Sequence, residues 1–165
     1  MAIREVRIMG DPILEKECRS VEKMTDRLQV LIDDMIDTMN DQNGVGLAAP
    51  QVGVLRRIAV VDIGDEHGTI VMVNPEIIES DGEQCGPEGC LSLPGKQGEV
   101  KRPNHVVVSA LDRDMNPITI EGTELLARAL CHEIDHLSGH MYTELVEGPL
   151  TDVDYADDDE EEYEE

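Results

Sequence analysis

The chain has 165 residues, of which 40% are hydrophobic and only 2% aromatic, so its core must be built from aliphatic side chains and Met. This length suits one domain, and the shortage of aromatic rings excludes a surface on which the bases of single-stranded nucleic acid stack. The formal net charge of −24 excludes a protein that binds DNA through a broad basic surface.

The distribution of charged and apolar residues predicts where the protein works and how far its domain extends. Residues 1–7 carry charges where a secretory signal would be apolar, and no apolar run is long enough to span a membrane. We therefore expect a cytoplasmic protein without a membrane partner and with its four Cys as free thiols. We also expect a single domain over residues 1–150. Residues 151–165 are predicted to be a disordered acidic tail, since ten of the last 14 residues are acidic.

The N-terminal third is predicted to contain one long helix. Apolar residues at helical spacing favour a helix over residues 26–41, with Thr25 as its N-cap and Asn43-Gly44 as its stop. Before this helix, residues 10–12 have the composition of a turn, and residues 13–18 are expected to form one or two helical turns.

Strands are predicted in the middle of the chain, followed by a buried helix. The β-branched runs that predict strands are residues 58–63, 69–73, 76–79 and 105–111. The Gly-rich residues 81–98 are expected to be irregular. The second helix opens at Gly122-Thr123 and ends at Gly139. Because it is apolar around most of its circumference, we expect it to lie in the centre of the fold.

The buried helix carries a metal-binding pattern, His132-Glu133-Ile134-Asp135-His136. Residues four apart lie on one face of a helix, so both imidazoles can bind one ion, with Glu133 beside it. Burying these polar side chains without a cation would be costly. A catalytic site also needs a third protein ligand and an open position for water. Cys85 and Cys90 are the candidates, whereas Cys18 and Cys131 are expected to pack in the core.

Two other interpretations of the same residues stay open at this stage. One is a zinc-dependent peptidase, although the third His of the metzincin pattern would fall at position 142, which is Tyr142. The other is a non-catalytic zinc centre with four ligands, Cys85, Cys90, His132 and His136. The second interpretation gives no function to Glu133.

Three segments together resemble the signature motifs of the peptide deformylase family: Gly44–Gly53, Glu88–Ser92 and His132–His136. They occur in the order found in that family, and the resemblance covers roughly residues 3–146. It implies an α+β fold in which antiparallel β-sheets surround a central buried helix carrying the HExxH motif. It also implies that residues 1–150 form a catalytic domain.

The resemblance implies a metal-dependent hydrolase that removes the N-formyl group from the initiator N-formylmethionine of newly made polypeptides and releases formate. By similarity, Cys90, His132 and His136 would bind one divalent metal ion, most commonly Fe(2+). Zn(2+), Ni(2+) and Co(2+) would suit the same ligands. Glu133 would act as the proton acceptor and donor. Gln51 and the backbone N–H of Leu91 would stabilise the oxyanion.

The resemblance also extends to the substrate and its source. The residues that would bind the nascent N-formylmethionyl polypeptide are Val45, Gly46, Gly89 and Leu125. Some family members dock on the ribosome through a basic C-terminal helix, whereas this chain has the acidic residues 151–165 there. We therefore expect that any contact with the ribosome does not use such a helix, and that the tail weakens or reroutes docking.

Overall fold

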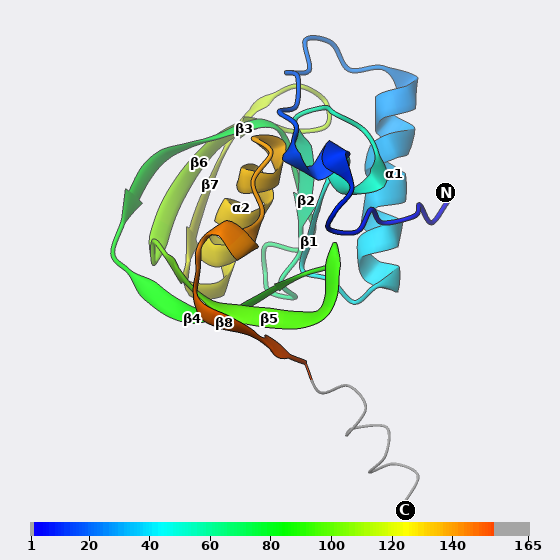
Figure 1. Cartoon of the computed structure of the whole chain (residues 1–165). Helices are drawn as coiled ribbons and strands as arrows, with labels where there is room; N and C mark the ends of the chain where they lie inside the picture. The colour runs from blue at the N-terminus through cyan, green and yellow to red at the C-terminus, as the bar shows by residue number, and fades with distance from the viewer. Residues whose placement is uncertain (1, 154–165) are drawn as a thin grey trace, which may run out of the picture.

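Two antiparallel sheets enclose helix α2 in the computed structural model, which describes residues 2–153 (Figure 1). The five-stranded sheet has the order β1 (Gly46–Ala48), β2 (Ile58–Val61), β3 (Ile70–Asp81), β6 (His105–Leu111) and β7 (Pro117–Thr123). The three-stranded sheet has the order β4 (Gln84–Cys90), β5 (Leu93–Arg102) and β8 (Val146–Asp152). The helices are α1 (Asp26–Asp41) and α2 (Glu124–Leu137), with short 3-10 helices η1 (Pro12–Glu15), η2 (Ala49–Val52) and η3 (Tyr142–Glu144). This architecture confirms the expected α+β fold.

Strand β2 shows that α1 and α2 pack on opposite faces of the five-stranded sheet. All four of its residues are buried. Ala59 and Val61 belong to the cluster that packs with α2, whereas Ile58 and Val60 belong to the cluster that packs with α1. Because alternate side chains of a strand point to opposite faces, this uninterrupted apolar run requires a helix on each face of the sheet.

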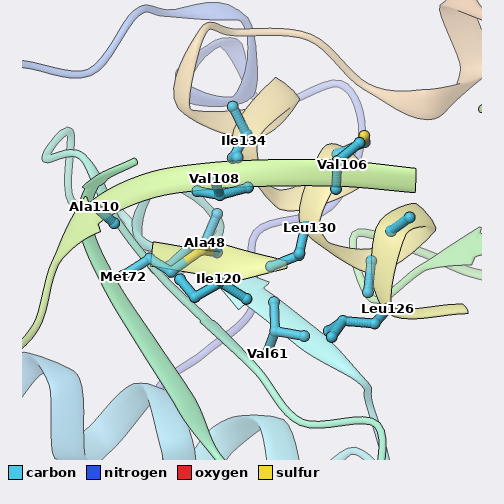
Figure 2. Close-up of a cluster of buried hydrophobic side chains, with 14 of the residues drawn as sticks. Ala48, Val61, Met72, Val106, Val108, Ala110, Ile120, Leu126, Leu130 and Ile134 are labelled. Atoms are coloured by element: carbon cyan, nitrogen blue, oxygen red, sulfur yellow. The ribbon is translucent and has the colours of Figure 1, made fainter. Parts of the chain in front are cut away.

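Helix α2 packs one side against the sheet and keeps a polar side for the functional site. Leu126, Leu130 and Ile134 point into the cluster shown in Figure 2, where the strands contribute Val61, Met72, Val108 and Ile120 among others. His132 and His136 are also buried but belong to neither hydrophobic cluster. Residues four apart share a helix face, so the same helix builds the core and presents two imidazoles.

Helix α1 has the predicted limits and holds the N-terminal segment. The Thr25 hydroxyl accepts the N–H of Leu28 at 3.2 Å, which satisfies one of the free donors at the helix start. The buried carboxylate of Asp34 accepts the backbone N–H of Ala2 at 2.8 Å and the Nε–H of Arg4 at 2.9 Å. The first residues of the described chain are therefore fixed along α1.

The prediction that residues 81–98 are irregular is wrong, because β4 and most of β5 occupy them. Only Glu88, Ser92, Gly98 and Val100 among residues 84–101 are buried, so the segment lacks the apolar alternation by which a strand is found. Antiparallel backbone pairing of β4 with β5 and of β5 with β8 forms this sheet. Backbone pairing of this kind leaves little trace in the side-chain pattern of either strand, and only the pairing of β5 with β8 joins distant segments.

Several other strand predictions need correction. The two strands expected at residues 69–73 and 76–79 are one strand, β3, with a register shift at Asn74-Pro75. Asn74 has a φ of 52°, which interrupts the pairing without ending the strand. Besides β4 and β5, three further strands were not predicted, namely β1, β7 and β8. Of residues 13–18, which were expected to form one or two helical turns, only residues 13–15 are helical, as part of η1.

The acidic tail is only partly covered by the structure. Thr151 and Asp152, which were assigned to the tail, belong to β8 and pair with Gln97 and Lys96 of β5. Residues 154–165, which make up most of the predicted disordered tail, lie outside the described residues. No helix within residues 2–153 combines the length and the apolar character needed to cross a membrane.

The central position of α2 can be tested with Leu130→Ala. Leu130 is fully buried, so its truncation should lower the free energy of unfolding by about 2–5 kcal/mol in urea denaturation. Val30→Ala is the matched control, because Val30 lies on α1 and is 51% exposed, and it should change this value by less than about 0.5 kcal/mol. A loss below about 1 kcal/mol for Leu130→Ala would contradict the packing described.

Candidate functional site

The structure brings together Cys90, His132 and His136. Cys90 lies at the end of β4, and the two His lie one turn apart on α2. The Cys90 Sγ is 3.3 Å from the Nε2 of His136, which is 3.2 Å from the Nε2 of His132. One ligand atom from each residue lies within 4.8 Å of the other two. These atoms therefore face a common point, as ligands of one ion do.

A tight turn with a register shift places Cys90 at this point. Cys90 pairs with Leu93 across the turn from β4 to β5, after a shift in register between Glu88 and Cys90. The shift falls at Gly89, where an added Cβ would be 3.3 Å from the carbonyl oxygen of Lys96. A glycine thus lets the two strands approach closely just before the thiol.

The donor set fits a divalent transition metal. One thiolate and two imidazoles, with one side left for water, form the ligand set of catalytic zinc sites and also suit Fe(2+), Ni(2+) and Co(2+). Burial and the neighbouring His132 lower the pKa of His136 well below its usual 6.5. His136 is therefore kept neutral, the form in which an imidazole binds a metal. Burial opposes the charged form of His132, but the neighbouring Glu133, Cys90 and Glu88 outweigh this effect and raise its pKa well above 6.5. His132 therefore releases a proton when a metal binds.

Cys85 does not join this group. Its side chain is exposed, and its Sγ lies 3.7 Å from an Oε2 of Glu99 on β5. A four-ligand centre that includes Cys85 is thus not formed within the described chain. The alternative of a zinc-dependent peptidase gives no function to Cys90, whereas the structure places the Cys90 Sγ 3.3 Å from the Nε2 of His136. Cys131 is buried in the core as expected, and burial raises its pKa to about 11.

Glu88 orients His132, and sequence reasoning assigned it no role. Its Oε2 is 2.7 Å from the Nδ1 of His132, so the Nδ1–H donates to the carboxylate and, in the neutral form that binds a metal, the Nε2 lone pair faces the ligand group. Burial opposes ionisation of Glu88, but hydrogen bonds from His132 and Arg102 lower its pKa from 4.5 to about 2. The ring of His132 is therefore fixed in one tautomer and one orientation. The feature of the sequence that could have indicated this role is the position of Glu88, two residues before the metal ligand Cys90.

Two buried Arg side chains neutralise Glu88. Arg102 donates to it from Nε at 3.0 Å and from Nη2 at 2.6 Å, and Arg128 donates from Nη1 at 3.0 Å. Arg102 also donates to Asp135 at 2.6 Å. Because these residues come from β4, β5 and α2, the network links the three-stranded sheet to the helix that carries both imidazoles.

Glu133 is the one buried carboxylate that faces the ligand group without a fixed partner. Its Oε2 lies 4.0 Å from the Nε2 of His132, and its Oε1 makes no hydrogen bond to the described chain. Burial raises the pKa of Glu133 from 4.5 to about 7, whereas a bound cation would favour the ionised form. A Cβ on Gly46 would lie 2.8 Å from the Cδ of Glu133. Only glycine leaves room for this carboxylate.

Gln51 directs its amide group toward the ligand group from η2. The side chain is buried, and its Oε1 accepts the N–H of Ala48 at 2.9 Å. Its Nε2 donates to the Ser92 hydroxyl at 3.0 Å and lies 3.4 Å from the Cys90 Sγ. Since the Ala48 N–H can only donate, the oxygen faces Ala48 and the NH2 group faces the site.

The remaining predicted residues line one cavity of about 520 Å³ next to these groups. Val45 and Leu125 are 45% and 49% exposed and contribute apolar surface, while Gly46 and Gly89 contribute bare backbone. Leu91 follows Cys90 and also lines the cavity. Two of the three metal ligands, Cys90 and His132, thus line this cavity together with the Glu133 carboxylate and the Gln51 amide, and the cavity can hold a peptide. This set of groups suits metal-assisted hydrolysis of an amide.

Comparisons with known proteins point to the same chemistry. A family model described as polypeptide deformylase matches residues 3–149. A peptide deformylase of Agathobacter rectalis is 61% identical over 160 residues, covering 97% of this chain and 100% of that protein. One of Lachnoclostridium phytofermentans is 58% identical, covering 98% and 100%. The crystal structure of a peptide deformylase from Legionella pneumophila matches with a TM-score of 0.85 at 49% identity, covering 88% of this chain and 86% of that one.

The role of Glu88 can be tested with Glu88→Gln. The neutral amide cannot balance two Arg side chains or hold the His132 tautomer as firmly, so the affinity for Zn(2+) should fall about 10–100-fold. Competition with a chromophoric chelator measures this affinity. Glu99→Gln, an exposed change on the neighbouring strand β5, should leave it unchanged. Equal affinities for the two variants would contradict the role assigned to Glu88.

The ligand set can be tested by replacing the two Cys of β4 separately. Cys90→Ser should lose most of its bound metal, because a hydroxyl is a poor ligand for these ions, whereas Cys85→Ser should keep the metal content of the unmodified protein. The metal content is measured after gel filtration by atomic absorption. Loss of metal from Cys85→Ser would contradict the three-ligand site and support the centre with four ligands.

Proposed function

Because this chain belongs to the peptide deformylase family, which removes the N-formyl group from the N-formylmethionine of nascent polypeptides, we propose that it does so at Cys90, His132 and His136. The observation that carries this proposal is that these three side chains converge on one point, beside a cavity lined by Cys90, His132, Glu133 and Gln51. None of these groups has another evident task, and each would be costly to bury for structural reasons alone.

The family depends on a metal, and the thiolate and two imidazoles support a single divalent ion as the cofactor. We propose Fe(2+) as the ion, with Zn(2+), Ni(2+) or Co(2+) as alternatives that the same donors would accept. When bound, such an ion supplies Lewis acidity and lowers the pKa of a coordinated water to near neutrality.

Glu133 moves the proton in this proposal. Its carboxylate accepts a proton from the attacking water and returns it to the nitrogen of methionine as the C–N bond of the formamide breaks. The products are formate and a free amino terminus. The unpartnered Oε1 of Glu133 supports this role, since that oxygen is free to accept a proton.

Gln51 and Leu91 stabilise the oxyanion that forms on the formyl oxygen. The Gln51 Nε2 lies 3.4 Å from the Cys90 Sγ and therefore reaches the space beside the ligand group. The backbone N–H of Leu91 is the second donor, directly after Cys90. A donor of this type contributes roughly 3–4 kcal/mol to transition-state stabilisation.

The substrate binds through one apolar side chain and its backbone. Val45 and Leu125 offer apolar surface to the methionine side chain. β1 pairs with a neighbour on one side only in the described sheet, so its free edge at Gly46 can pair with an extended peptide. Recognition of this kind depends little on the substrate residues that follow methionine. This suits an enzyme that acts on many different nascent chains.

The proposed function predicts formate release from formyl-Met-Ala-Ser by metal-loaded protein and no cleavage of acetyl-Met-Ala-Ser. Glu133→Gln should lower kcat by at least about 10²-fold, because the proton acceptor is lost. Glu121→Gln, which changes an exposed carboxylate on β7, should not. Loading with Fe(2+) under anaerobic conditions and with Ni(2+) in parallel controls for oxidation. Absence of formate from both loaded samples would refute the proposal.

A further inference from the structure

Ser92 is fully buried behind the site and has no role in the reaction described so far. Its hydroxyl accepts a hydrogen bond from the Gln51 Nε2 at 3.0 Å. Its carbonyl accepts the N–H of Met9 at 2.7 Å. Ser92 does not line the cavity next to the metal ligands. Any effect of Ser92 on the reaction must therefore pass through the groups that it contacts.

The Gln51 amide is held at both ends. The terminal torsion of a Gln side chain is soft, so an unrestrained amide would rotate over a wide range. Here Ala48 fixes the oxygen at 2.9 Å. The Nε2 donates one hydrogen to Ser92 and the other to the Cys90 Sγ at 3.4 Å. The hydroxyl of Ser92 thus sets the plane of the amide and the direction of the second hydrogen, which points toward the metal ligands.

The N-terminal segment anchors the same two residues through their backbones. Arg7 donates its N–H to the carbonyl of Gln51 at 2.6 Å, and Met9 donates to that of Ser92. Through these two hydrogen bonds, one short segment bridges η2 and the turn after Cys90. The distance between Gln51 and Ser92 is therefore constrained by the backbone as well as by their side chains.

We propose that Ser92, held in place by Met9, is a positioning residue that aims the Gln51 amide at the oxyanion. The proposal rests on the role of Gln51 in the proposed function. It requires the Ser92 hydroxyl to act through Gln51 alone, because this hydroxyl touches neither the cavity nor a metal ligand in the structure. The consequence is a change in kcat without a change in KM or metal content.

A double-mutant cycle with Ser92→Ala and Gln51→Ala tests this coupling. Ser92→Ala should lower kcat on formyl-Met-Ala-Ser about 5–20-fold, within the loss expected for a misaimed donor, and should leave KM and metal content unchanged. In the Gln51→Ala background the same change should lower kcat less than about 2-fold, since no amide remains to be aimed. Ser92→Thr keeps the hydroxyl and should retain most of the activity.

Controls separate positioning from a general loss of structure. Ser109→Ala, which removes an exposed hydroxyl on β6, should not change kcat, and thermal unfolding identifies any variant that fails to fold. An unchanged kcat for Ser92→Ala, or an equal fold loss in both backgrounds, would overturn the inference while leaving the proposed function intact. An unchanged kcat for Gln51→Ala would refute the oxyanion role itself, and the inference with it.

Discussion

The buried carboxylate of Glu88 is the contact on which the geometry of the site depends. Glu88 and Cys90 share strand β4, while His132 and His136 share α2, so the three ligand atoms meet only if strand and helix keep one relative position. Glu88 fixes that position through His132, Arg102 and Arg128. A buried charge network of this kind contributes little net stability, because desolvation of the ions offsets their attraction. Its contribution is a defined arrangement of ligands.

The site also shows how a strongly acidic chain builds a centre for a cation. Glu88 and Asp135 lie close to the ligand group, but Arg102 and Arg128 compensate their charge within the buried network. Glu133 is left as the carboxylate without an ion pair to Arg or Lys at the cavity. The net charge of −24 is thus a property of the rest of the chain. It does not determine the electrostatics at the metal ligands, which are set by the buried Glu88, Arg102 and Arg128 and the half-buried Asp135.

Local patterns were sufficient to predict part of this molecule. Helix α1 was predicted to the residue, because a helix is specified by its own periodicity and cap, and the His pair followed from helical spacing. Strands β4 and β5 were not predicted, although they pair with each other across a short turn, because few of their side chains are buried and apolar and the pairing is made by the backbone. The contacts of Glu88 with His132 and of Ser92 with Gln51 were missed for another reason. They join residues 44 and 41 positions apart in the chain, and no local pattern reveals such a contact.

X-ray absorption at the zinc edge of zinc-loaded protein tests the central claim most directly, because it counts the ligand atoms around the ion. The account predicts one sulfur at about 2.3 Å, from Cys90, and lighter ligands at about 2.0–2.1 Å, from two imidazoles and an exchangeable oxygen. The sulfur signal should disappear in Cys90→Ser and persist in Cys85→Ser. Two sulfur ligands, or none, would contradict the assignment of Cys90, His132 and His136 as the metal centre.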